Sequence, residues 1–142
     1  MRTPSPEQKH PVITGAFFAL STGDLDRLVA WYRGNLGFTV DQMRTQPSGL
    51  KAALLSRPGA LLEIAQLPSA RARKAAGISD EIGAVHGVMK AGWLVADLDA
   101  VYALAKERRL DITFAPAQPV GNPLRAMVVK DPDGNTIQFF GK

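Results

Sequence analysis

The sequence predicts an α+β fold: two tandem βαβββ modules that form a curved eight-stranded mixed sheet around a cleft, with the helices outside. The main observation is an internal repeat, because the triplet Asp24-Leu25-Asp26 recurs 73 residues later as Asp97-Leu98-Asp99. An apolar stretch precedes each triplet and an amphipathic segment follows it. Each half also ends on a turn glycine followed by an apolar strand.

In the first half, residues 13–20 read as a strand and the segment after Asp24 reads as a helix. Asp24 is a good N-cap, because its carboxylate can accept hydrogen bonds from the first turn, and Gly37 is a candidate C-cap. The apolar residues fall on one helical stripe: Leu25, Leu28, Val29, Tyr32 and Leu36. Two further strands are predicted at residues 38–44 and 50–56, and a last one follows Gly59.

The second half repeats this order. Residues 88–96 form the predicted first strand, and Asp97 caps a helix whose stripe is Leu98, Val101, Tyr102 and Ala105. Strands follow at about 110–115 and 124–130, and the turn Asp131-Pro132-Asp133-Gly134 introduces the last one. We therefore expect a single domain over residues 1–142. It consists of an N-terminal arm (1–11), a first module (12–67), a connector (68–84) and a second module (85–142).

Composition excludes several classes of protein. The chain of 142 residues has no cysteine, so disulfides, thiolate metal sites and cysteine nucleophiles are excluded. No apolar run approaches the roughly 20 residues of a membrane span, and residues 1–11 lack the apolar core of a secretory signal. The net charge is +4, but aromatic residues are not interleaved with the basic ones as in nucleic-acid-binding modules. A cytoplasmic protein with no nucleic-acid or membrane partner is expected.

The repeated motifs resemble those of the vicinal oxygen chelate superfamily, which contains glyoxalase I, extradiol dioxygenases, fosfomycin-resistance enzymes and bleomycin-resistance binding proteins. The segments that carry the resemblance are Gly23–Asp26, Trp31–Arg33, Leu36–Phe38, Val95–Asp99, Asp131–Asn135 and Ile137–Phe139. The resemblance extends over nearly the whole chain, from about Ile13 to Phe140. It implies the paired-module fold, but one scaffold supports many chemistries.

The resemblance also allows a test for a metal site. Metal-dependent members hold one divalent ion through four positions, typically His on the first strand and Glu on the last strand of each module. Counting along this sequence places Phe17, Glu63, Ala91 and Gln138 at these positions. Only Glu63 is a strong ligand, and neither histidine of the chain falls at one of these positions. The sequence therefore predicts no metal and no other cofactor.

Alternation along the last strands indicates which side chains face the cleft. If Leu62 and Ile64 meet the first helix, then Glu63 points into the cleft, and Gln138 does so by the same argument. Trp93 lies two residues after Ala91, on the same face of the strand, and is predicted to add an aromatic wall to the cleft. Alternation places Lys90 on the other face, and the direction of its side chain is left open. The predicted ligand-binding residues are Phe17, Glu63, Lys90, Ala91, Trp93, Gln138 and Phe140.

Three functions remain open at this point. The first is a metal-free protein that binds a small apolar or aromatic molecule, or an anionic one, in the cleft between the modules, as antibiotic-sequestering members of the superfamily do. The second is a cofactor-independent enzyme of lyase or isomerase type with Glu63 as the catalytic acid or base. The third is a metal-dependent lyase or dioxygenase with rearranged ligands.

A homodimer is expected in each case. Curved sheets leave edge strands that need to be covered, and single-chain members of the superfamily often pair. Bleomycin itself is not expected as the ligand, because bleomycin is cationic and this chain is basic.

Overall fold

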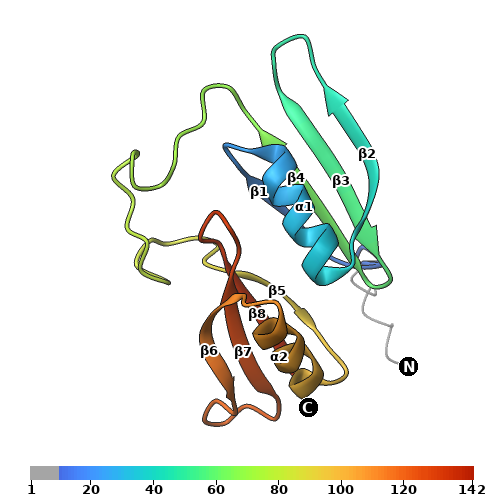
Figure 1. Ribbon diagram of the computed structural model, residues 1–142, viewed down its shortest axis with the longest axis vertical. Helices are drawn as coiled ribbons and strands as arrows, with labels where there is room; N and C mark the ends of the chain where they lie inside the picture. The colour runs from blue at the N-terminus through green and yellow to red at the C-terminus, as the bar shows by residue number, and fades with distance from the viewer. Residues whose placement is uncertain (1–9) are drawn as a thin grey trace, which may run out of the picture.

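The computed structural model describes residues 10–142, so the predicted N-terminal arm lies almost entirely outside the described residues. Two modules of identical element order follow one another (Figure 1). The first contains β1 (Phe17–Ser21), α1 (Leu25–Leu36), β2 (Thr39–Thr45), β3 (Lys51–Arg57) and β4 (Ala60–Gln66). The second contains β5 (Ala91–Leu94), α2 (Leu98–Glu107), β6 (Asp111–Ala117), β7 (Arg125–Lys130) and β8 (Thr136–Gly141). The predicted βαβββ repeat is confirmed.

The eight strands are divided between two four-stranded mixed sheets, ordered β1-β4-β3-β2 and β5-β8-β7-β6. In each sheet the first and last strands of the module pair in parallel, and the remaining pairs are antiparallel. Within the described residues the sheets do not close into a barrel.

Helix α1 begins and ends as its sequence predicts. The side chain of Asp24 accepts a hydrogen bond from the backbone N–H of Arg27, at 3.1 Å. Gly37 adopts φ 71°, and its N–H donates to the carbonyl of Arg33 while the N–H of Phe38 donates to that of Tyr32. This left-handed residue satisfies the last carbonyls of the helix and turns the chain into β2.

Helix α2 has the same start but a different end. The side chain of Asp97 accepts from the N–H of Ala100, at 3.0 Å. No glycine follows the helix; instead Arg109 takes the left-handed conformation, with φ 53°. The guanidinium of Arg108 donates to the carbonyls of Gly34 and Asn35 at the end of α1, and so joins the two modules.

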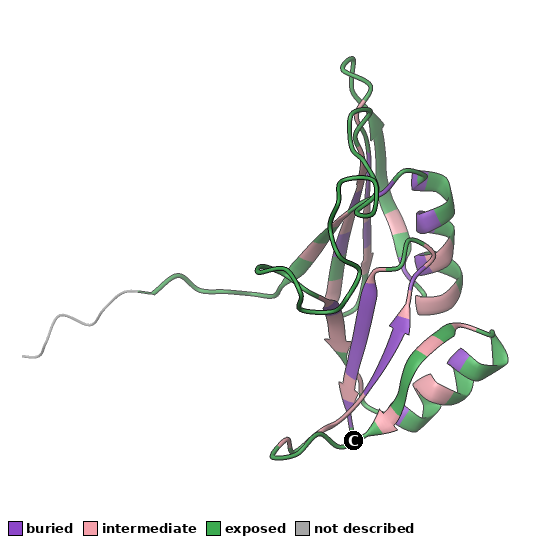
Figure 2. Cartoon of the chain, turned by 90° about the vertical axis from the view of Figure 1, so that its left-hand side faces the viewer, coloured by how far each residue is buried: buried purple, intermediate pink, exposed green. Residues whose placement is uncertain are grey.

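Both modules share one apolar core, which lies between the sheets and the helices. Its fully buried members come from both halves and include Leu28, Tyr32, Leu62, Leu98, Met127 and Ile137. Figure 2 shows α1 and α2 on the same side of the two sheets. Each sheet therefore has one face covered by a helix and one open face, and the two open faces look the same way.

The segment between β4 and β5, residues 67–90, contains turns but no helix or strand. Its backbone hydrogen bonds are local, such as the bond from the N–H of Ala76 to the carbonyl of Ala72. It forms a long loop that extends away from the sheets, at the left of Figure 1. Among the described residues, no helix is long and apolar enough to cross a membrane.

Candidate functional site

The open face of the first sheet carries Glu63 in the middle of β4. The neighbours of Glu63 in sequence, Leu62 and Ile64, are fully buried against the helix side, so Glu63 projects to the open face as expected from alternation. Its partners on the adjacent strands are Ala19 and Leu54. No Lys, Arg or His nitrogen of the described residues lies within 4 Å of its carboxylate. The half-buried carboxylate thus stands among apolar side chains.

Phe17 lies on the same open face. It pairs with Leu61 on β4, while its neighbour Phe18 packs against the core. The ring of Phe17 is 62% exposed, a large exposure for a phenylalanine within a strand. The structure therefore brings Phe17 and Glu63 to one surface, two strand positions apart.

The open face of the second sheet is centred on Gln138 of β8. Ile137 and Phe139 on either side are buried in the core, so Gln138 points away from α2. The ammonium of Lys90, just before β5, donates a hydrogen bond to Oε1 of Gln138. The direction of Lys90, which the sequence leaves open, is therefore toward the open face.

Ala91 and Trp93 lie on the opposite face from the one expected. Ala91 pairs with Ile137 and Trp93 pairs with Phe139, and both belong to the helix-covered side. The cause is the register. Phe17 precedes its N-cap, Asp24, by seven residues, and the residue seven positions before Asp97 is Lys90, not Ala91.

Trp93 is instead the centre of an aromatic cluster at the junction of the two modules. Its ring centroid lies 5.5 Å from Phe38, 5.8 Å from Phe18 and 6.4 Å from both Tyr32 and Phe139. Contacts of this kind stabilise a core beyond the area that they bury. Trp93 thus holds the modules together and does not line the open face.

Further apolar side chains cover the open face of the second sheet. Leu94 pairs with Phe140, the last predicted site residue, and is 78% exposed. Phe114 on β6 pairs with Val128, next to Gln138, and is 60% exposed. The open faces of both sheets therefore present exposed aromatic and aliphatic groups around one polar centre each.

The donor set does not fit a divalent metal. Glu63 is a suitable ligand, but the corresponding positions of the second sheet hold the neutral amide of Gln138 and the ammonium of Lys90, which repels a cation. Among the described residues, no three His, Cys, Asp or Glu side chains come together.

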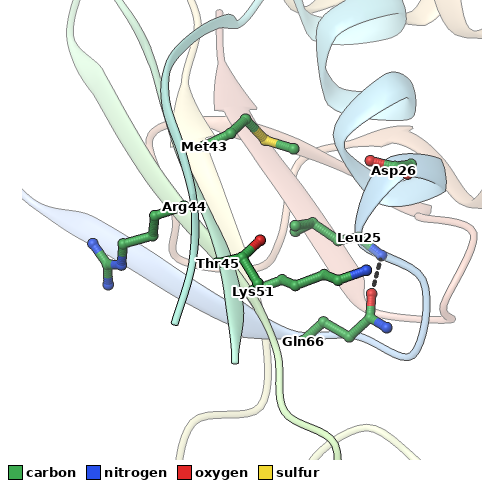
Figure 3. A pocket seen from close by; sticks show the side chains of 7 residues that line it. All are labelled: Leu25, Asp26, Met43, Arg44, Thr45, Lys51 and Gln66. Carbon is green, nitrogen blue, oxygen red and sulfur yellow. Dashed lines mark hydrogen bonds between the residues drawn. The ribbon is translucent and has the colours of Figure 1, made fainter. Parts of the chain in front are cut away.

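Two hollows lie elsewhere on the molecule. One, of about 250 Å³, lies beside the first turn of α1 (Figure 3), where Gln66 accepts a 2.8 Å hydrogen bond from the N–H of Leu25. Lys51 points toward this helix start, and Arg44 points away. The other, of about 390 Å³, lies between Trp31 and Arg109. Neither includes Glu63 or Gln138 among its lining residues.

The family is decided by a sequence model that matches residues 15–139, that of the Glyoxalase/Bleomycin resistance protein/Dioxygenase superfamily. The chain belongs to this superfamily. A comparison with curated protein sequences finds no match.

Several solved structures share this fold at low sequence identity. A glyoxalase family protein from Enterococcus faecalis has a TM-score of 0.73 at 18% identity, covering 87% of this chain and 94% of its own. TnmS3, an antibiotic binding protein from Streptomyces sp. CB03234, has a TM-score of 0.66 at 18% identity, covering 94% and 98%. A glyoxalase I mutant from Zea mays has a TM-score of 0.62 at 18% identity, covering 86% of this chain and only 42% of its own. These likenesses show the fold alone.

The sequence predicts only a turn at Asp131, but in the structure this residue is buried, with 4% exposure. Its carboxylate accepts from the backbone N–H groups of Asp133 and Asn135, from the amide of Asn135 and from the hydroxyl of Tyr32. The sequence does contain a signal for this contact. The hydroxyl of Tyr32 is the one polar group on the otherwise apolar face of α1, and a buried hydroxyl needs a hydrogen-bond partner.

Proposed function

We propose that this protein of the glyoxalase superfamily binds a small, largely apolar or aromatic molecule on its open sheet faces, without a metal. The observation that carries the proposal is the apolar character of those faces, where Phe17, Leu94 and Phe114 are each at least 60% exposed. Apolar patches exposed on a protein surface favour the binding of a ligand or a partner. The antibiotic-binding neighbour TnmS3 supports the same class of function for this chain.

A homodimer is part of the proposal. Within one chain both open faces look the same way, so neither covers the other (Figure 2). A second copy can supply an opposing face and enclose a ligand between modules of different chains. The edge strands β2 and β6, most of whose residues are exposed, are further surface that pairing can cover.

Binding can be tested with a neutral aromatic probe, N-phenyl-1-naphthylamine, whose fluorescence rises in apolar surroundings. We expect Phe17→Ala and Leu94→Ala each to weaken binding about tenfold, because each removes roughly 1.4 kcal/mol of apolar contact with the probe. Val120→Ala is the matched control, since Val120 is fully exposed on the loop before β7. Absence of probe binding to the wild type, or equal loss in all three variants, would refute the proposal.

A second candidate function is a cofactor-independent enzyme of lyase or isomerase type. The observation that favours it is Glu63, a half-buried carboxylate on the open face with no cationic partner among the described residues. Such a group can transfer a proton to or from a bound molecule. Glu63→Gln distinguishes the two functions, because it abolishes turnover by an enzyme of this kind while leaving the neutral probe bound.

A further inference from the structure

The open face of the second sheet carries a positive charge that no described residue neutralises. Lys90 is half-buried, and its ammonium donates to Oε1 of Gln138, whose side chain is itself only 7% exposed. Among residues 10–142, no carboxylate oxygen lies within 4 Å of the Lys90 ammonium. An ammonium has three N–H donors, and the amide oxygen of Gln138 is the acceptor for one of them.

The strand next to this charge leads from the ammonium to an apolar end. The open-face positions of this strand run Lys90, Gly92, Leu94, so no side chain stands between the other two. A Cβ at Gly92 would lie 2.0 Å from the carbonyl oxygen of Gln138, so the backbones are in close contact here and the position must stay glycine. From Lys90 to Leu94 the strand covers roughly 13 Å, the length of a small aromatic molecule.

The chemistry along that length changes from cationic to apolar. At one end stands the ammonium of Lys90, and at the other stand Leu94 and Phe140, which are neighbours across β5 and β8. A ligand that matches both ends has one anionic group and an aromatic or aliphatic body. A partly buried ammonium favours such an anion because water screens the charge pair less than at a fully exposed site.

We infer that Lys90, held by Gln138, is the residue that selects an anionic ligand, so that the molecule bound is an aromatic compound with a single negatively charged group. This inference rests on the proposed function and specifies the class of ligand. Gln138 is a positioning residue, because it fixes the ammonium and carries no charge of its own.

The test uses two probes that share one skeleton. The anionic probe, 8-anilinonaphthalene-1-sulfonate, is N-phenyl-1-naphthylamine with a sulfonate added, so the difference in their binding reports the contribution of the anionic group. We expect Lys90→Met to weaken the anionic probe about tenfold, equivalent to about 1.4 kcal/mol, and to change the neutral probe less than twofold. Lys90→Arg keeps the charge and is expected to retain most of the affinity for the anionic probe.

Two further variants keep the result decisive. Lys74→Met removes the same charge from the exposed connector and is expected to change neither probe. Gln138→Glu leaves Lys90 in place but puts a carboxylate beside it, and this variant is expected to weaken only the anionic probe.

The outcomes separate the inference from the function on which it rests. If the neutral probe binds but Lys90→Met and Gln138→Glu leave the anionic probe unchanged, or weaken both probes equally, the inference is wrong and the proposed function stands. If neither probe binds the wild-type protein, both are wrong.

Discussion

The hydroxyl of Tyr32 donates a 2.7 Å hydrogen bond to Oδ2 of Asp131 and so links the first helix of the chain to its last turn. Both side chains are buried, at 0% and 4% exposure. Beside this bond, Arg27 of α1 donates to the carbonyl of Pro132 in the same turn, at 2.6 Å. The two modules therefore meet through a buried polar contact as well as through apolar packing.

Tyr32→Phe should destabilise the protein by about 1.5–3 kcal/mol. The change removes one hydrogen-bond donor from a buried carboxylate and leaves the ring packing intact. Urea denaturation followed by circular dichroism measures the loss. Tyr102→Phe is the control, since Tyr102 lies on α2 with its ring under the exposed Lys106, and a change below about 0.5 kcal/mol is expected there. Equal losses in both variants would contradict this account of the bond.

Alkaline pH should unfold the protein through the same residue. Burial, and then the negative charge of Asp131, raise the pKa of Tyr32 above its ordinary value of 10.0. The folded state therefore favours the neutral phenol. The contribution of Tyr32 to the free energy of unfolding is fully present below pH 10, and above pH 10 the free energy of unfolding falls by about 1.4 kcal/mol per pH unit.

The measurement is simple because the chain has only two tyrosines. In the Tyr102→Phe variant, ultraviolet absorbance of the phenolate reports Tyr32 alone. We expect that absorbance to appear together with the loss of circular dichroism. A phenolate signal near pH 10 from a chain that is still folded would show that Tyr32 is not held neutral by the fold.

Two glycine-to-alanine substitutions should have opposite signs. At Gly92 an added Cβ meets the backbone oxygen of Gln138 at 2.0 Å, so Gly92→Ala must push β5 from β8 and should cost about 1–3 kcal/mol or more. At Gly34, within α1, nothing lies within 4 Å, and alanine should stabilise the helix by about 0.5–1 kcal/mol. Thermal denaturation of the pair measures both, and a stabilised Gly92→Ala would disprove the close approach of the two strands.

Metal ions should not affect stability. A divalent ion held at one hundred times its dissociation constant would add about 2.7 kcal/mol to the free energy of unfolding. We expect neither a chelator nor added Zn²⁺ or Ni²⁺ to change the Tm of the purified protein, and we expect Glu63→Gln to behave identically. One tightly held ion per chain, lost in Glu63→Gln, would instead favour the metal-dependent alternative.

The protein should sediment as a dimer at micromolar concentration. Its mass is then twice the 15.3 kDa of one chain. The reason is the exposed apolar area on the open faces together with the exposed edge strands β2 and β6. A species of 15.3 kDa alone would exclude a stable dimer.

The fold was readable from the sequence because its signals are local and repeated. Asp24 and Asp97 cap the two helices, and Gly37 ends the first, each through contacts within four residues of itself. Most strands lie close to the predicted positions, but β1 begins at Phe17 and not at residue 13, and β5 covers only Ala91–Leu94 of the predicted 88–96. The division into two four-stranded sheets depends on pairing between distant strands, which periodicity alone does not determine.

The candidate site was readable only in part. Alternation on β4 and β8 placed Glu63 and Gln138 on the open faces, because each lies between two plainly apolar residues. On β5 the pattern is weaker, since Gly92 carries no side chain and Lys90 precedes the strand. The predicted register of β5 is therefore wrong by one residue. Because side chains alternate between the two faces, this error exchanges the faces of the whole strand, and the prediction places Trp93 in the cleft although it lies in the core.

The backbone hydrogen bonds of residues 67–89 are local, and the chain can therefore be divided within this segment. The shared core, the Tyr32–Asp131 bond and the contacts of Arg108 all bypass this segment. A polypeptide ending after Gln66 and a second one beginning shortly before Lys90 thus retain every one of these contacts. The two halves, made as separate chains, are suited to reassemble on one another as a split protein.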